Sequence, residues 1–373
     1  MGWKSIFQIL IVPYLGAVLC CGLGVEALGA ASNKRSSAMI YEDPFDLGAG
    51  GASLTRASQA GILIANPALL PYGDGFHRWV GLEPTLIVGK DSLDFAKTLS
   101  NGGGSKDPLA LVDTLTKTPL HVGVTNAASY INKGFGLGMF NRFEPDLQAK
   151  KYGQNGLPEV RFSAESYQGV AMSLASLTFT RAISVGATVK YLYAAEPDVA
   201  IEIVDQEAMK KISSSDGLRS MVTHNTGTGA DVGMIFFDQG MNLDWKLALK
   251  LDDMGGTKLT GAGALKEIPQ TYSAGMATTI HNGTDALHLA LDYRDVGAAH
   301  KEKMFKRIRV SSKLMIRRYV GIGAGMLDGW PSYAAELDLL LFRATFAFYT
   351  RELGDSPGMA PRPIYSAGLA LGF

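Results

Sequence analysis

Apolar residues occupy every second position over long parts of this chain. In one such run, Leu243, Trp245 and Leu247 alternate with Asp244 and Lys246. Successive side chains of a β-strand point to opposite faces, so a period of two predicts strands with one apolar and one polar face. The same pattern returns at the end of the chain, and it predicts an all-β fold.

The alternating segments divide the chain into about fourteen expected strands. They span residues 76–89, 119–131, 133–145, 158–178, 183–203, 222–237, 242–254, 268–281, 285–296, 304–317, 318–328, 332–340, 342–352 and 362–373. Strand ends predicted from a pattern are uncertain by about two to four residues, so twelve or sixteen strands also fit.

The connections between these strands alternate in length. Long connections are expected at 90–118, 146–157, 204–221, 255–267 and 353–361, with tight turns between them. A barrel that puts long loops on one rim and short turns on the other is typical of the outer membrane, where the apolar face points outward to lipid. A soluble barrel would place the same apolar face inside. The loop pattern favours a transmembrane antiparallel β-barrel.

The composition argues against a nucleic-acid-binding protein and against helical membrane spans beyond the N-terminus. The chain has 373 residues, of which 47% are hydrophobic, and it carries 35 basic and 35 acidic residues. Balanced charge gives no field that would attract nucleic acid. Beyond the N-terminus there is no apolar run of about 18 residues, the length of a membrane helix. If the chain spans a membrane, it must do so as a closed barrel, because only helices and closed barrels satisfy every backbone group in lipid.

The N-terminus has the pattern of a signal peptide. Lys4 precedes the apolar stretch 6–23, and small residues follow at 28–30, so residues 1–30 are expected to be removed on export. The two cysteines, Cys20 and Cys21, lie inside this segment. Lipidation at Cys20 or Cys21 stays open, although the approach to Cys20 fits a lipobox poorly. With the segment removed, no thiol chemistry is left.

The segment 31–75 precedes the barrel strands expected over 76–373. Its part from Phe45 to Leu70 is rich in Gly and Ala and does not alternate. It is too apolar for a linker and too rich in glycine for a stable free helix. We expect a compact plug packed against other backbone. The longest loop, 90–118, contains two helical patterns at 92–99 and 107–115 and is expected to be either a small lid or a surface loop.

Several motifs resemble the FadL-type long-chain fatty-acid transporters of the bacterial outer membrane. They are Gly48–Ser53 with Asn66-Pro67-Ala68 before the first strand, then Leu289–Val296, and the ending Tyr349–Gly354, Pro357-Gly358 and Gly372-Phe373. The ending looks like the shorter FadL-like barrels and their PorV-like relatives. In one departure, Leu69 follows the Asn-Pro-Ala where family members usually have glycine. The chain is also shorter than the well-studied transporters, which leaves the ligand open.

The resemblance implies a barrel of fourteen strands with an N-terminal hatch in its lumen. It implies uptake of long-chain fatty acids or similar hydrophobic molecules, contact with outer-membrane lipid, and recognition of Phe373 by the barrel-assembly machinery. The alternative function is that of a PorV-like scaffold or shuttle for exported proteins. A general porin is a further alternative, which the plug-like segment disfavours.

Two groups of residues are candidates for a hatch or gate. Asn66, Pro67 and Ala68 form either a movable gate or a fixed plug. Gly134, Gly136 and Gly138 are expected on the inward face of the third strand, where glycine marks a kink or a close backbone approach. The family opens its wall at a kink in this strand; the alternative is tight packing against the plug.

A basic stripe is the candidate ligand site. Arg307, Arg309, Lys313 and Arg317 are expected to face the lumen, where an arginine can bind a carboxylate with two hydrogen bonds. The alternative, which we favour, is pairing with lumenal acids. The acids considered are Glu336, Asp338, Asp292 and Asp295.

Catalysis, a metal and a cofactor are not expected. The six histidines are scattered without the spacing of metal ligands, and neither G-x-S-x-G nor H-E-x-x-H occurs. An outer-membrane hydrolase is therefore the least favoured alternative.

Overall fold

The computed structural model describes residues 41–57, 61–72, 78–98, 108–150, 158–178, 182–195, 198–202, 224–240, 243–262, 267–300, 302–339, 341–353 and 356–372. Residues 1–30 and Phe373 lie outside this range, so the expected signal peptide and the terminal aromatic residue remain predictions. No helix in the described part of the chain is long and apolar enough to cross a membrane.

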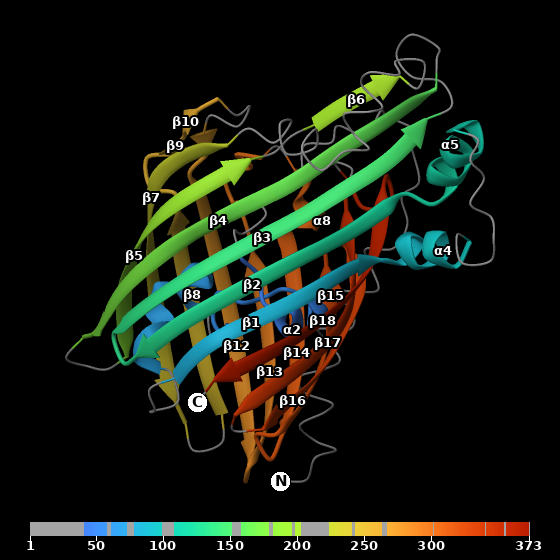
Figure 1. Ribbon diagram of the computed structural model, residues 1–373. Coiled ribbons are helices and arrows are strands. Elements are labelled where there is room, and N and C mark those ends of the chain that lie inside the picture. Colours follow the sequence, from blue (N-terminus) through green and yellow to red (C-terminus); the bar gives the residue numbers. More distant parts are fainter. Residues whose placement is uncertain are drawn as a thin grey trace. The chain divides into compact units, whose positions relative to one another are not determined.

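Fourteen antiparallel strands close into a barrel (Figure 1). They are β1 (Arg78–Gly89), β2 (Leu120–Asn132), β3 (Phe135–Lys150), β4 (Glu159–Leu177), β5 (Ile183–Ala195), β7 (Asn225–Gln239), β8 (Leu243–Asp252), β12 (Thr271–Asn282), β13 (Asp285–Tyr293), β14 (Ile308–Ile316), β15 (Val320–Leu327), β16 (Trp330–Leu339), β17 (Phe342–Glu352) and β18 (Pro361–Gly372). Each strand pairs with its neighbour in sequence, and β1 closes the ring on β18. The expected fold class is confirmed.

The apolar faces of the strands point outward. Trp245 and Leu369 are 48% and 45% exposed, whereas Asp244 and Ser366, on the opposite faces of the same strands, are buried. An apolar outer face with polar side chains inside is the arrangement of a membrane barrel and the reverse of a soluble one. The expectation that the apolar face points outward and the polar face points into the barrel is therefore confirmed.

A β-bulge in β1 reverses which residues face the lumen. Val80 pairs with Ser129, whereas Glu83 pairs with Ala127, so β1 uses three steps where β2 uses two. The extra residue changes the parity of all positions after it. Glu83 consequently points into the barrel, where its side chain is 2% exposed, instead of into lipid.

The two sides of the barrel differ in height. β3 and β4 have 16 and 19 residues, whereas β14 and β15 have nine and eight. The short strand β6 (Asp198–Glu202) pairs with the upper part of β4. The strand expected over 183–203 is therefore wrong beyond Ala195: β5 ends there, and the chain returns to the sheet as β6.

Helices occupy two of the connections within the described ranges. The expected helical pieces of the 90–118 loop correspond to α4 (Lys90–Thr98) and α5 (Pro108–Lys117), and α5 buries Leu115 against Ala149 and Val160 of the high side of the wall. The strand expected over 304–317 is wrong at its start, because 304–307 form the short helix α8 (Met304–Arg307). Small strands β9 (Thr257–Lys258), β10 (Thr260–Gly261) and β11 (Glu267–Ile268) lie in the β8–β12 connection.

Candidate functional site: the lumenal segment and its wall

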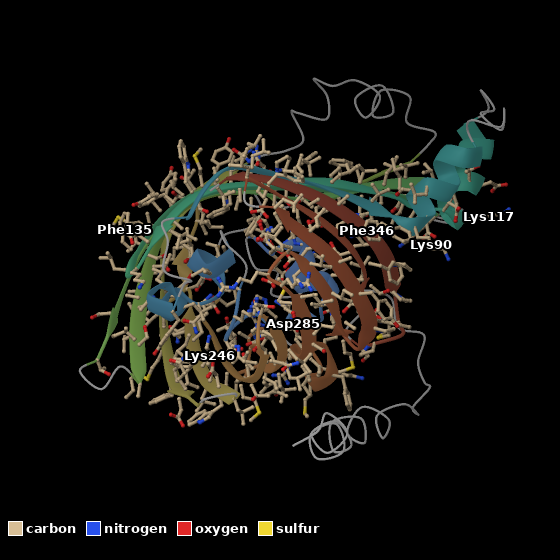
Figure 2. The ribbon with its side chains drawn as sticks, turned by 90° about the horizontal axis from the view of Figure 1, so that it is seen from below. Lys90, Lys117, Phe135, Lys246, Asp285 and Phe346 are labelled. Atoms are coloured by element: carbon tan, nitrogen blue, oxygen red, sulfur yellow. The ribbon has the colours of Figure 1, made fainter. Side chains whose placement is uncertain are left out.

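The chain before β1 lies inside the barrel. Residues 41–57 and 61–72, here called the lumenal segment, contain α2 (Pro44–Gly48), α3 (Gly61–Ala65) and the 3-10 helix η1 (Pro67–Tyr72). Figure 2 shows these short helices, in blue, within the ring of strands. Their side chains are almost all buried, and they meet inward-facing residues of the wall.

Three carboxylates of the lumenal segment bind cations of the wall. Arg309 Nη1 donates to Glu42 Oε1 at 2.7 Å, and ion pairs join Asp43 to Arg343 and Asp46 to Lys313. Asp43 also caps α2, because its Oδ1 accepts from the N–H of Phe45 at 2.8 Å. One side chain thereby starts the helix and ties it to β17.

Burial and ion pairing act in opposite directions on these lumenal carboxylates. Burial raises the pKa of Glu42, but the guanidinium groups of Arg309 and Arg351 outweigh it and hold that pKa below its ordinary value. For Asp43, burial again raises the pKa, and Arg343 reverses the balance so that the pKa is lowered. Both groups are therefore charged at neutral pH and bind to the wall as anions.

The middle of the lumenal segment is hydrogen bonded to one carboxylate of β13. Asp292 Oδ2 accepts from the N–H groups of Ser53 and Leu54 at 2.8 and 3.0 Å. Arg294 Nη2 donates to the same Oδ2 at 3.0 Å and to Ser53 Oγ at 2.8 Å. Asp292 is thus engaged with the backbone of the lumenal segment.

The Asn-Pro-Ala motif lies against two wall glycines. Gly186 of β5 and Gly233 of β7 are register partners. A Cβ atom at Gly233 would come within 2.0 Å of Asn66 Oδ1, and one at Gly186 within 2.7 Å of the Ala68 nitrogen. Asn66 itself is fully buried, and its Nδ2 donates to the carbonyl of Leu54 at 3.0 Å. The absent side chains create the space that Asn66, Pro67 and Ala68 fill.

The candidate glycines of the third strand divide into two kinds. Gly136 and Gly138 face inward as expected, and a Cβ atom on them would come within 2.3 and 2.6 Å of the Leu63 side chain. Gly134 is not on that face: it lies in the turn before β3 with φ +85°. Gly136 and Gly138 therefore have the geometry of close packing against the lumenal segment, and a gating role stays a prediction.

The basic stripe is only half present. Arg309 and Lys313 face the lumen, but Arg317 lies exposed in the turn after β14. Arg307 ends α8, where its Nη1 donates to the carbonyl of Asp295 at 2.7 Å. The inward stripe is shortened because Arg307 and Arg317, at its two ends, lie outside β14.

The acids expected to neutralise the basic stripe are not those that do so. Arg309 and Lys313 pair with Glu42 and Asp46 of the lumenal segment. Among the wall acids, Asp292 binds Arg294 and Glu336 lies 3.6 Å from Arg343. No ion pair joins Asp295 or Asp338 to the stripe in the described part of the chain. Arg309 and Lys313 are thus paired with acids, as the favoured alternative expected, but with Glu42 and Asp46 in place of the acids considered.

Some residues of this site were missed from the sequence. Glu42, Asp43 and Asp46 were not recognised as anchors, because nothing local distinguishes them from surface acids. Gly186 and Gly233 carry a signal that could have been used: both fall at polar, inward positions of alternating strands, where a missing side chain indicates close approach by another backbone.

The space that remains around the lumenal segment includes two small cavities, one along Glu42, Asp46 and Gly51 and one between Leu63 and Gly138. Each has room for about one water molecule. Within the described residues there is no group of three or more His, Asp, Glu or Cys side chains placed to hold a metal ion.

Comparisons with known proteins identify the fold. No family model matches the chain, and no curated protein sequence matches it. Among solved structures, it is similar to a deletion mutant of the monoaromatic hydrocarbon channel TodX, with 12% identity over 89% of this chain and 98% of that one and a TM-score of 0.54. It is also similar to the toluene transporter TbuX of Ralstonia pickettii, with 13% identity over 90% and 98% and a TM-score of 0.51.

TodX and TbuX belong to the FadL family. The chain has the FadL-type fold. At this level of identity the similarity concerns the architecture alone. A FadL-type barrel with an apolar outer belt is a protein of the bacterial outer membrane, as expected.

Proposed function

We propose that this FadL-type barrel carries hydrophobic small molecules across the outer membrane, with long-chain fatty acids among them. The observation that carries the proposal is the lumenal segment, which occupies the closed barrel and is tied to the wall through Glu42, Asp43 and Asp46. Porins keep a water-filled lumen, whereas a plugged barrel opposes free diffusion of polar solutes. The fold shared with TodX and TbuX, which are described as hydrocarbon channels or transporters, supports the same class of cargo.

The ion pairs between the lumenal segment and the wall distinguish a fatty acid from a neutral hydrocarbon as a transported molecule. Arg309 and Lys313 bind side-chain carboxylates in the lumen. A fatty acid carries the same chemical group, so its carboxylate can compete with Glu42 or Asp46 for these cations. A neutral hydrocarbon has no such means of releasing the lumenal segment. We infer that carboxylate exchange at Arg309 and Lys313 favours fatty acids.

We propose a transport role without catalysis. Ser92, His121 and Asp146 lie close together, but Ser92 Oγ hydrogen bonds to the backbone N and O of His121. The His121 ring places Nδ1 2.9 Å from Asp146 Oδ1. A hydrolytic triad needs the serine oxygen on the histidine ring. These contacts support a structural role for the three residues.

The first test is native mass spectrometry with lipid extraction on the barrel purified in mild detergent. A co-purified fatty acid, together with displacement of a fluorescent fatty acid, would support the proposal. Arg309→Met should weaken fatty-acid binding relative to toluene binding, because it removes the cation for the carboxylate. Arg318→Met, in an exposed turn, is the matched control. A barrel that binds neither ligand and restores no uptake overturns the proposal. A stably co-purifying polypeptide would indicate the scaffold function instead.

A further inference from the structure

Three amide side chains form a polar stripe on the outer wall. Asn126 of β2 pairs in register with Asn141 of β3, and Asn141 pairs with Gln168 of β4. Directly paired residues of adjacent strands lie on the same face of the sheet. On the far side of Asn126, the register partner is Pro84 of β1, which has no N–H. Asn126, Asn141 and Gln168, here called the amide stripe, thus run across three neighbouring strands.

The amide stripe faces outward within the apolar belt. Asn141 is exposed, and its neighbours on the same face, Met139 and Phe143, are 61% and 41% exposed. Arg142, on the opposite face, is buried in the lumen. Asn126 and Asn141 each lie six residues from the turn that joins their strands. With about 3.3 Å per residue and a tilt near 45°, this is roughly 14 Å from the rim, near the middle of an apolar band about 25 Å high.

Asn141 and Gln168 expose their amides at this depth, and the amide of Asn126 is not fully satisfied either. The side-chain oxygen of Asn126 is buried by its neighbours and has no hydrogen-bond partner within the described residues. Hydrocarbon supplies no donor or acceptor, so an amide there is unfavourable unless another protein group meets it. By contrast, the outward face of β8 carries Leu243, Trp245, Leu247, Leu249 and Leu251. The wall at β2–β4 therefore departs from the usual lipid-facing chemistry.

We propose that the amide stripe is the contact surface between two copies of this chain in the membrane. An amide has both donors and acceptors, so the same group can bond its equivalent across a twofold axis. A second copy brings that identical stripe to the same depth. The stripe is uncharged, which disfavours a lipid headgroup as its partner. Asn141 and Gln168, the two exposed amides of the stripe, lie at the centre of the contact, with Met139 and Phe143 packing around them.

The test is the oligomeric state in lipid bilayers, measured by single-molecule photobleaching over a range of protein-to-lipid ratios. We expect dimers of the unmodified chain. The double variant Asn141→Leu and Gln168→Leu should lower the association constant by about tenfold or more, because hydrogen bonds between membrane-embedded segments stabilise their association. Ser312→Leu is the control, because it removes an outward polar group on β14, seven strands around the ring from β3.

Cysteine cross-linking tests the geometry independently of stability. Asn141→Cys should form a disulfide-linked dimer on mild oxidation, and Ser312→Cys should not. The unmodified chain, oxidised in parallel, reports any bond made by Cys20 or Cys21. A monomeric unmodified chain at all ratios overturns the proposal, as does a double variant that dimerises equally well. Selective capture of a different protein at Asn141→Cys also overturns it.

Discussion

At the scale of single residues, glycines of the wall determine where the lumenal segment can lie. Gly186 and Gly233 leave the space taken by Asn66, Pro67 and Ala68, and Gly136 and Gly138 leave the space taken by Leu63. Packed interiors tolerate added atoms poorly. Because these glycines have no side chain, they leave the space that fixes the position of the lumenal segment.

Gly233→Ala should loosen the Asn-Pro-Ala motif without opening the barrel. The new Cβ would come within 2.0 Å of Asn66 Oδ1, so Asn66 must move, which weakens its hydrogen bonds with the Ala68 N–H and the Leu54 carbonyl. We expect a cost of about 1–3 kcal/mol, seen as faster hydrogen exchange over 61–72. Gly81→Ala is the control, since its Cβ would meet only the Leu371 oxygen at 3.8 Å. Unchanged exchange over 61–72 would contradict the packing argument.

Arg343 should be a costly cation of the lumen to remove. It pairs with Asp43 and Glu83, both almost fully buried. Arg343→Met leaves two buried carboxylates without their partner, for which we expect a loss of about 3–5 kcal/mol in the free energy of unfolding by urea. Adding Asp43→Asn should restore part of that loss, as a double-mutant cycle would show. Equal effects of Arg343→Met and Arg318→Met, in an exposed turn, would refute the assignment.

At the scale of elements, the anchoring of α2 should persist over the physiological pH range and fail only in acid. Glu42 and Asp43 have pKa values below the ordinary ones, so they stabilise the folded state above the unfolded values of about 4.3 and 3.9 and lose this effect as pH falls through the folded values. Hydrogen exchange of 41–57, corrected for intrinsic rates, should be constant from pH 8 to 5 and rise below pH 4. Glu42→Gln should weaken that dependence. Loss of protection already at pH 6 would contradict it.

Strands were predictable from the sequence because alternation is local, and contacts between distant segments were not. The run around Trp245 identified β8 closely, since lipid and lumen impose opposite chemistry on adjacent positions. The same periodicity continued through Lys306 and Arg307, where the chain instead forms α8, because a short helix at a strand end leaves no distinct pattern. Lys313 forms an ion pair with Asp46, which is 267 residues away in the sequence. No local signal distinguishes that acid from the wall acids nearer in sequence.

At the scale of the whole barrel, the lumenal segment should govern conductance. Deleting residues 41–72 removes three acids and one arginine, while Arg309, Lys313 and Arg343 stay in the wall. In planar bilayers we expect a large rise in single-channel conductance and a shift towards anion selectivity, since the lumen gains net positive charge. Heat-dependent mobility of the purified barrel checks that the variant is folded. A folded variant that conducts no better than the full chain would show that something else closes the lumen.

The uneven height of the wall has a consequence for the surrounding bilayer. β15 has eight residues, which at about 3.3 Å each and a tilt near 40° span roughly 20 Å, less than the apolar band of about 25 Å on an outer-membrane barrel. β4, with 19 residues, exceeds it. Lipids beside β14 and β15 must therefore compress or the barrel must lean, and either adjustment costs fractions of a kcal/mol per Å of mismatch. The protein would then prefer thin membrane regions and create a locally thinned, more permeable annulus along one flank.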